Sequence, residues 1–307
     1  MERILIIGTG GVGGYFGSKI AQAGFDVTFV ARGSHFEAIK EKGLFIKSIK
    51  ESFHLPTVKV IEKISEIEQV DMIFLCTKLN QVEEVAKQLP AIIHEKTIVI
   101  PLLNGITAEN QLSEHIAKKN IVHGLVKIFS KIERDGLIHH FGGEPILVFG
   151  NFFHKNQHFL DRLERVIKNS KLTYKRSENI LSDKWKKFIL ICSGGLTTLS
   201  RATYGEIREH KETRQLLINL LQEIKNLGVV NKIDLPEDLV NNTLKMIDNF
   251  PYEATSSMQR DFYNKKPSEL DFLTGEVVRL ALKHNISIPV NQFIYSCLKI
   301  HEERIKV

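Results

Sequence analysis

The chain has 307 residues, which is enough for two domains of ordinary size. Hydrophobic residues make up 43% of it and charged residues 25%, a balance that excludes a disordered, collagenous or fibrous protein. No apolar stretch approaches the ~20 residues of a membrane-spanning helix, and the N-terminus lacks the long apolar core of a secretory signal. We therefore expect a cytoplasmic protein with no membrane partner.

The formal net charge of +6 comes from 42 Lys and Arg against 36 Asp and Glu, and it indicates an affinity for anions. The basic residues are dispersed, and no basic stripe interleaved with aromatic residues occurs, so we expect no nucleic-acid partner. Three scattered cysteines and histidines without H-E-x-x-H spacing predict neither a disulfide framework nor a metal site.

The first half alternates apolar strands with amphipathic helices. Strands are predicted at residues 3–7, 27–31, 44–49, 57–60, 72–76 and 97–102, and helices at 11–23, 35–42 and 82–89. Near-continuous apolar strands with helical crossovers predict a parallel sheet covered on both faces. Further strands at 122–130, 137–141 and 146–149 are expected to extend this sheet near its edge in antiparallel fashion.

The second half contains helical patterns only. Helices are predicted at residues 178–192, 216–227, 234–246, 267–283 and 289–304. We expect an α/β fold class, with a Rossmann-type nucleotide-binding domain over residues 1–170 and an all-helical substrate domain over 171–307. The leucine-rich helix at 216–227 is compatible with the domain core and with a homodimer interface, and core is the simpler interpretation.

A glycine-rich loop follows the first predicted strand and opens the first helix. Its sequence is Gly8-Thr9-Gly10-Gly11-Val12-Gly13, which fits G-x-G-x-x-G. The first glycine of such a loop makes a tight turn, the second lets the backbone approach a pyrophosphate, and the third lets the helix pack on the strand. Glycines also serve plain turns, but this placement predicts dinucleotide binding.

The residue at the end of the second strand distinguishes NAD from NADP. A carboxylate there accepts from the ribose 2′-hydroxyl of NAD, whereas an arginine accommodates the 2′-phosphate of NADP. Arg32 ends this strand, and the nearest acid, Asp26, lies at its other end. Arg32 therefore favours NADP, the alternative being an ordinary surface charge.

Polar residues follow two further strands. Lys78 and Asn104 come after the strands at 72–76 and 97–102, so they belong at the carboxyl edge of the sheet where ligands of such folds bind. Solvent exposure or turn formation would explain either residue equally well.

Candidate catalytic groups also occur in the helical half. Lysines 184, 186 and 187 offer an ammonium that can protonate a carbonyl receiving hydride, but their periodicity does not choose between them, and a lysine run is usually a solvated face. Glu269 at a helix start is explained equally well by the helix dipole, and Ser256 and Ser257 by helix capping.

Taken together these segments resemble the ketopantoate reductases (2-dehydropantoate 2-reductases) over essentially the whole chain. Besides the glycine loop, the resemblance is carried by six segments: Cys76-Thr77-Lys78, Leu103-Asn104-Gly105, Trp185-Lys186-Lys187-Phe188, Gly195-Leu196-Thr197-Thr198-Leu199-Ser200-Arg201-Ala202, Ser256-Ser257-Met258-Gln259-Arg260-Asp261 and Lys266-Pro267-Ser268-Glu269-Leu270-Asp271. The resemblance implies the reduction of 2-dehydropantoate to (R)-pantoate with NADPH, a step in pantothenate and coenzyme A biosynthesis.

The resemblance also implies roles for individual residues. Lys187 would be the proton donor, and Ser257 would hydrogen-bond the substrate. Lys78 and Asn104 would contact both cofactor and substrate, Glu269 would lie on the cofactor side of the cleft, and Arg32 would bind the 2′-phosphate.

One departure concerns the substrate. Many family members have asparagines one and two helical turns after the catalytic lysine, whereas this chain has Ile191 and Gly195. Because a site selects a polar substrate only while its polar partners exist, a reductase of a different 2-oxo acid is an alternative. A non-catalytic NADP-binding regulator is a second one, although the retention of Lys78, Asn104, Lys187 and Glu269 argues against it.

Overall fold

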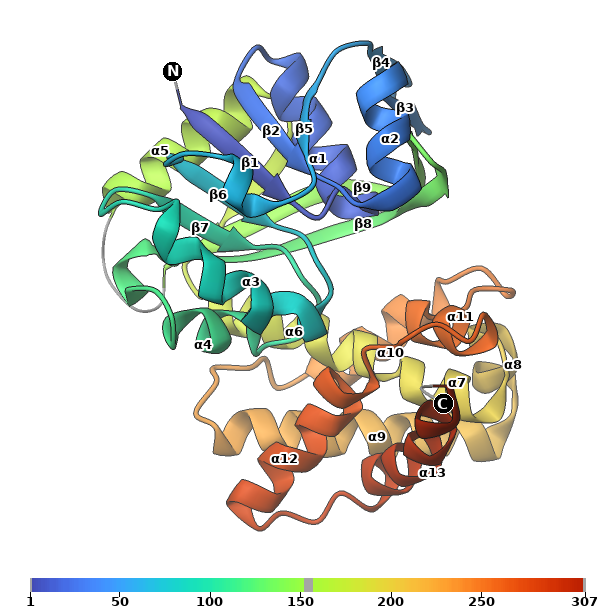
Figure 1. Ribbon diagram of the computed structural model, residues 1–307. Coiled ribbons are helices and arrows are strands. Elements are labelled where there is room, and N and C mark those ends of the chain that lie inside the picture. Colours follow the sequence, from blue (N-terminus) through green and yellow to red (C-terminus); the bar gives the residue numbers. More distant parts are fainter. Residues whose placement is uncertain (1, 152–156, 306–307) are drawn as a thin grey trace. The chain divides into compact units, whose positions relative to one another are not determined.

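The computed structural model describes residues 2–151 and 157–305 (Figure 1). The chain forms two compact units, Met1–Ile180 and Leu181–Val307. The boundary expected at residue 170 falls just after α5 (Gln157–Asn169), before β10 (Thr173–Arg176) pairs with a strand of the first unit.

The first unit contains the predicted parallel sheet. Its strands lie in the order β5 (Lys59–Ile61), β2 (Asp26–Val30), β1 (Arg3–Ile7), β6 (Met72–Leu75) and β7 (Ile98–Pro101). Every neighbouring pair is parallel, and β1, at the centre, is where the order reverses direction. All residues of β6 and β7 are buried, as expected for apolar strands covered on both faces.

The expectation for the strands after residue 120 was wrong in two respects. Strands β8 (His123–Arg134) and β9 (Leu137–Gly150) are antiparallel, but with β3 (Leu44–Ser48), β4 (Phe53–Leu55) and β10 they form a second sheet. In addition, β9 is one continuous strand rather than two. Its two glycines, Gly142 and Gly143, lie opposite Phe129 at an irregularity in the pairing of β8 with β9, which does not end the strand.

Helix α1 (Gly11–Gln22) joins the two sheets into one core. It contacts β1, β2 and β6 of the first sheet as well as β3, β8 and β9 of the second. Small residues allow this close approach, since a Cβ at Gly17 would lie 2.7 Å from Phe29 and one at Gly14 would lie 2.6 Å from Ile138. The remaining helices of the unit are α2 (Gly33–Lys42), α3 (Val82–Gln88), α4 (Ala108–Ser113) and α5, with short 3₁₀ turns at Ile64–Glu66, Leu79–Gln81, Leu89–Ala91 and Lys118–Asn120.

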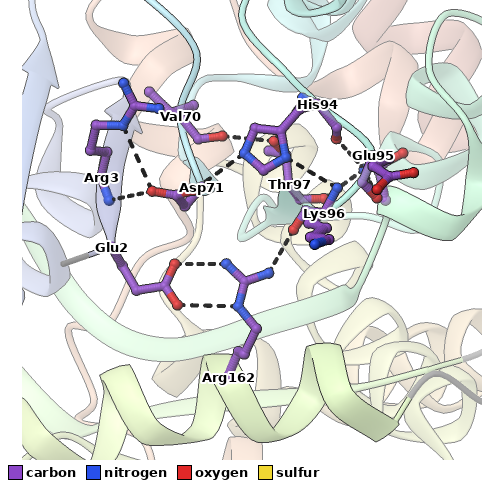
Figure 2. A network of polar contacts seen from close by, with 10 residues as sticks. Glu2, Arg3, Val70, Asp71, His94, Glu95, Lys96, Thr97 and Arg162 are labelled. Carbon is purple, nitrogen blue, oxygen red and sulfur yellow. Dashed lines mark hydrogen bonds and ion pairs between the residues drawn. The ribbon is translucent and has the colours of Figure 1, made fainter.

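A polar network holds the amino-terminal end of the first sheet (Figure 2). Asp71 accepts hydrogen bonds from the Arg3 backbone N–H at 2.8 Å and from His94 Nε2 at 3.2 Å. Arg162 of α5 makes two bonds to the Glu2 carboxylate, at 3.1 and 2.7 Å. Burial raises the pKa of Asp71. The hydrogen bonds from Arg3 and His94, together with the charges of these two residues, outweigh this effect and leave the pKa of Asp71 below its ordinary value.

The described part of the second unit consists of helices. They are α6 (Ile180–Cys192), α7 (Gly194–Ser200), α8 (Tyr204–Glu209), α9 (Lys211–Val230), α10 (Leu239–Asp248), α11 (Ser257–Tyr263), α12 (Thr274–His284) and α13 (Pro289–Ile305), with a 3₁₀ turn at Leu270–Phe272. The leucine-rich helix is α9, in which Leu217, Leu220, Leu221, Ile224 and Leu227 are buried. This side of α9 is therefore core, as the simpler interpretation predicted. Among the described helices, none is both long and apolar enough to cross a membrane.

Candidate active site

The glycine-rich loop begins directly after β1 and opens α1. Gly8 has φ +96°, a backbone conformation that favours glycine, and a Cβ on it would lie 2.9 Å from the backbone of Cys76 and Thr77. A Cβ at Gly13 would lie only 2.1 Å from the Gly8 carbonyl oxygen. A Cβ at Gly10, in contrast, would have no atom within 4 Å. Gly8 and Gly13 are thus required by the fold, whereas Gly10 borders open space.

This loop fits a dinucleotide. Gly10, the residue that precedes α1, offers no side-chain cap, and the first turn of this 12-residue helix contains no acidic residue. The amide dipoles at the start of α1 therefore keep their positive character for an anion such as a pyrophosphate. The bare face at Gly10 leaves room for such a group to approach the backbone.

The side chain of His35 supports the glycine-rich loop through hydrogen bonds, a role that the sequence did not indicate. The Gly136 N–H donates to His35 Nδ1 at 3.1 Å, so the hydrogen resides on Nε2, which donates to the Thr9 carbonyl at 2.9 Å. Thr9 also donates its backbone N–H and its hydroxyl to the Val30 carbonyl. His35 is only 9% exposed, and it links the glycine loop to the turn between β8 and β9. The predicted helix began at His35, and its residue type alone did not show that it faces the glycine loop.

The structure brings the predicted nucleotide-site residues of the first unit to one edge of the sheet. Arg32, Lys78 and Asn104 follow β2, β6 and β7, and the glycine loop follows β1. Because these strands are parallel, their carboxyl ends share one edge. Lys78 and Asn104 are half-buried, and Arg32 is exposed, with its guanidinium 3.8 Å from Glu84.

The three lysines of the second unit differ in their surroundings on α6. Lys184 is buried, Lys186 pairs with Asp183 at 3.4 Å, and Lys187 is half-buried. The helix is anchored by Trp185, whose indole Nε1 would lie 2.6 Å from a Cβ at Gly228 on α9. Trp185 and the neighbouring Phe188 therefore fix α6 in the helical core and with it the position of Lys187.

The two serines, Ser256 and Ser257, also have different surroundings. Ser256 caps α11, because its hydroxyl accepts from the Gln259 N–H at 3.0 Å, and it receives a hydrogen bond from Thr197 of α7 at 3.3 Å. Ser257 is the first residue of α11 and is exposed. Capping thus accounts for Ser256 and leaves Ser257 oriented toward solvent within this unit.

Glu269 lies in a loop that is tied to α13. Its backbone carbonyl accepts from the N–H groups of Phe272 and Leu273, so it precedes a 3₁₀ turn rather than a long helix. The neighbouring Ser268 donates to Glu302 at 2.7 Å, and Asp271 forms an ion pair with Lys299 at 2.7 Å. These two bonds hold the segment on either side of Glu269.

Gly195 faces the helical core. A Cβ there would lie 3.0 Å from Ile294 of α13 and 3.1 Å from the hydroxyl of Thr274. A single turn residue, Ser193, separates α6 from α7, and its backbone stays in the right-handed helical region, with φ −57° and ψ −23°. Ile191, the other departure, remains on α6 and is half-buried.

No group of three His, Cys, Asp or Glu side chains in residues 2–151 and 157–305 is arranged to hold a metal ion. Of the three free cysteines, Cys192 is completely buried, and this burial raises the pKa of its thiol far above the ordinary value. A thiolate nucleophile is therefore not available at Cys192.

Comparison with known proteins gives the family. The family model for ketopantoate reductase PanE/ApbA matches residues 4–153, and the model for the C-terminal domain of the same family matches residues 179–302. This chain belongs to the ketopantoate reductase family.

Individual relatives agree with this assignment over their full length. The chain is 30% identical to the uncharacterized oxidoreductase YkpB of Bacillus subtilis, with 98% of this chain and 99% of that protein covered. It is 27% identical to a 2-dehydropantoate 2-reductase of Nostoc sp., with 99% and 96% covered. Both comparisons extend across the two units of the fold.

Solved structures show the same fold. A PanE/ApbA family ketopantoate reductase from Ralstonia eutropha superposes with a TM-score of 0.90 at 22% identity, covering 99% of this chain and 100% of that one. A D-mandelate dehydrogenase in complex with NADH and anilino(oxo)acetate also has a TM-score of 0.90, at 23% identity and the same coverage. Members of this ketopantoate reductase fold thus include proteins that act on different acids.

Proposed function

We propose that this protein reduces the ketone of a 2-oxo acid with NADPH, and that 2-dehydropantoate is its substrate and (R)-pantoate its product. The observation that carries the proposal is the glycine loop, whose bare Gly10 and uncapped helix start suit a dinucleotide, in a chain of this family. Arg32 at the end of β2 favours the 2′-phosphate of NADPH over NADH.

In this proposal Lys187 is the catalytic residue. When bound, the reduced nicotinamide supplies a hydride to the ketone carbon. The Lys187 ammonium donates a hydrogen bond to the ketone oxygen, stabilises the negative charge that develops there, and transfers one proton to it, giving the hydroxyl of the product. Lys78, Asn104 and Ser257 would bind the substrate, and Glu269 would contribute to the cofactor side of the site.

The test compares Lys187→Ala with Lys186→Ala, a neighbour on the same helix whose ammonium already pairs with Asp183. The glycine loop belongs to the first unit and Lys187 to the second, so Lys187→Ala should leave NADPH binding within about twofold of wild type. Its turnover of 2-dehydropantoate should fall by roughly 10²–10⁴-fold, the usual contribution of general acid catalysis. Equal turnover in the two variants would show that another group supplies the proton.

A second candidate is a reductase of a 2-oxo acid with an apolar substituent. Ile191 presents an aliphatic side chain on α6, so a polar contact expected for a hydroxylated substrate is missing at this position. A panel of 2-oxo acids, compared by kcat/KM, distinguishes the candidates. A preference for phenyl- or alkyl-substituted acids over 2-dehydropantoate would favour this second one.

A further inference from the structure

An acidic residue lies directly beside the arginine that is proposed to select NADPH. Strand β5 pairs with β2 in parallel, and the Ala31 N–H donates to the Ile61 carbonyl at 3.1 Å. Glu62, the residue after β5, is therefore next to Arg32 and Gly33, the residues after β2. None of the sequence patterns pointed to Glu62, because the strand before it has only three residues.

The carboxylate of Glu62 accepts a hydrogen bond from the first backbone amide of α2. Its Oε1 accepts from the Gly33 N–H at 3.1 Å. Helix α2 has no side-chain cap and no acid in its first turn, so Glu62 supplies the negative charge that complements the start of this helix. The backbone of Glu62 is itself fixed, because the Glu66 carboxylate accepts from the N–H groups of Glu62 and Lys63 at 3.2 and 2.7 Å.

A second carboxylate lies on the other side of Arg32. Glu84 of α3 is 3.8 Å from the Arg32 guanidinium, and both side chains are more than 60% exposed. An anion that binds at Arg32 must therefore compete with Glu84 for the guanidinium. At Gly33, the adjacent amide, it must compete with Glu62.

We infer that Glu62 is a selectivity residue that weakens the binding of the 2′-phosphate and thereby lowers the preference for NADPH over NADH that Arg32 alone would give. This inference rests on the proposed function, since it requires a nicotinamide dinucleotide at the glycine loop. A phosphate dianion at Arg32 would displace Glu62 from the Gly33 N–H or lie close to its charge. The 2′-hydroxyl of NADH brings no charge and can donate a hydrogen bond to the same carboxylate.

The experiment measures dissociation constants rather than turnover. Wild type, Glu62→Gln and Glu68→Gln are titrated with NADP⁺ and with NAD⁺ by isothermal calorimetry. The amide introduced by Glu62→Gln keeps an oxygen for the Gly33 N–H but loses the charge. Glu68 is an exposed glutamate of the same segment that lies near the amino-terminal ends of the strands, so Glu68→Gln controls for a change of net charge.

We expect Glu62→Gln to bind NADP⁺ about tenfold more tightly than wild type, the size of the repulsion between a carboxylate and a phosphate several ångströms apart in a solvated site. Its affinity for NAD⁺ should stay equal or fall slightly, and the gain should shrink at high salt. The inference would be overturned if Glu62→Gln had the same ratio of NADP⁺ to NAD⁺ affinity as wild type, or if Glu68→Gln changed this ratio equally. Either result would leave the proposed function standing. Failure of wild type to bind either dinucleotide would overturn both.

Discussion

The replacement of His35 by phenylalanine tests how the glycine loop is held. Phenylalanine fills nearly the same volume but forms no hydrogen bond, so the Thr9 carbonyl and the Gly136 N–H both lose their partner at a residue that is only 9% exposed. Leaving a buried polar group unsatisfied costs about 1–3 kcal/mol, and two such groups give a loss of about 3 kcal/mol. For a unit of this size we expect the Tm to fall by roughly 6–12 °C.

The matched control is His54→Phe, which removes one hydrogen bond, to the Lys42 carbonyl, at an exposed position. We expect it to lower the stability by less than about 1 kcal/mol. Thermal unfolding followed by circular dichroism measures both variants, and calorimetric titration measures NADP⁺ binding. His35→Phe should also bind NADP⁺ more weakly, because the Thr9 carbonyl is no longer held. If His35→Phe unfolds at the same temperature as His54→Phe, the histidine does not support the loop as described.

The geometry of the first unit leads to three further predictions. Gly10→Ala should have the thermal stability of wild type, because its Cβ would contact no atom, yet it should lose most of its affinity for NADP⁺. Gly13→Ala should fold poorly, because its Cβ would lie 2.1 Å from a carbonyl oxygen. Equal stability of the two variants in thermal unfolding would contradict these different roles of the two glycines. Arg32→Ala should weaken NADP⁺ binding by roughly 10–100-fold and NAD⁺ binding by less than about twofold, by calorimetric titration; equal losses would show that the arginine does not contact the 2′-phosphate. Asp71→Asn should lower the free energy of unfolding by about 1 kcal/mol at pH 7. Because the pKa of Asp71 is lowered in the folded state, this difference should be complete above the unfolded pKa of about 4 and shrink as the pH falls through the folded pKa, as denaturation at pH 7 and at a series of lower pH values will show. A difference that stays constant over that series would assign it to packing.

Local patterns were sufficient to predict the nucleotide-binding sheet. The strands β6 and β7 are short apolar runs of the kind that forms buried strands, and the loop after β1 contains Gly8, whose positive φ favours glycine. Their parallel arrangement follows from the helical crossovers between them. Arg32 could be placed at the carboxyl edge for the same reason.

Features that depend on pairing between distant segments could not be read from the sequence. The second sheet requires β3 to lie beside β9, more than 90 residues away, and no periodicity encodes that choice. The bonds of His35 to Thr9 and of Glu62 to Gly33 likewise join side chains to backbone groups from other elements. A hydrogen bond to a backbone group does not depend on the residue type of the partner, so the sequence does not reveal it.

The helical unit illustrates a further limit. Gly195 comes two helical turns after Lys187, where many family members have an asparagine, but a Cβ at Gly195 would meet Thr274 and Ile294 of the helical core. The substrate argument that depends on position 195 is therefore weaker than the one that depends on Ile191.

The most direct test of the account is the oxidation of NADPH by the purified protein in the presence of 2-dehydropantoate, followed by the absorbance of the reduced nicotinamide. We predict oxidation that depends on the 2-oxo acid, is faster with NADPH than with NADH, and falls by at least about 10²-fold in Lys187→Ala. NADPH binding without turnover of 2-dehydropantoate or any other 2-oxo acid would contradict the assignment as a reductase and would favour a protein that binds the dinucleotide without using it.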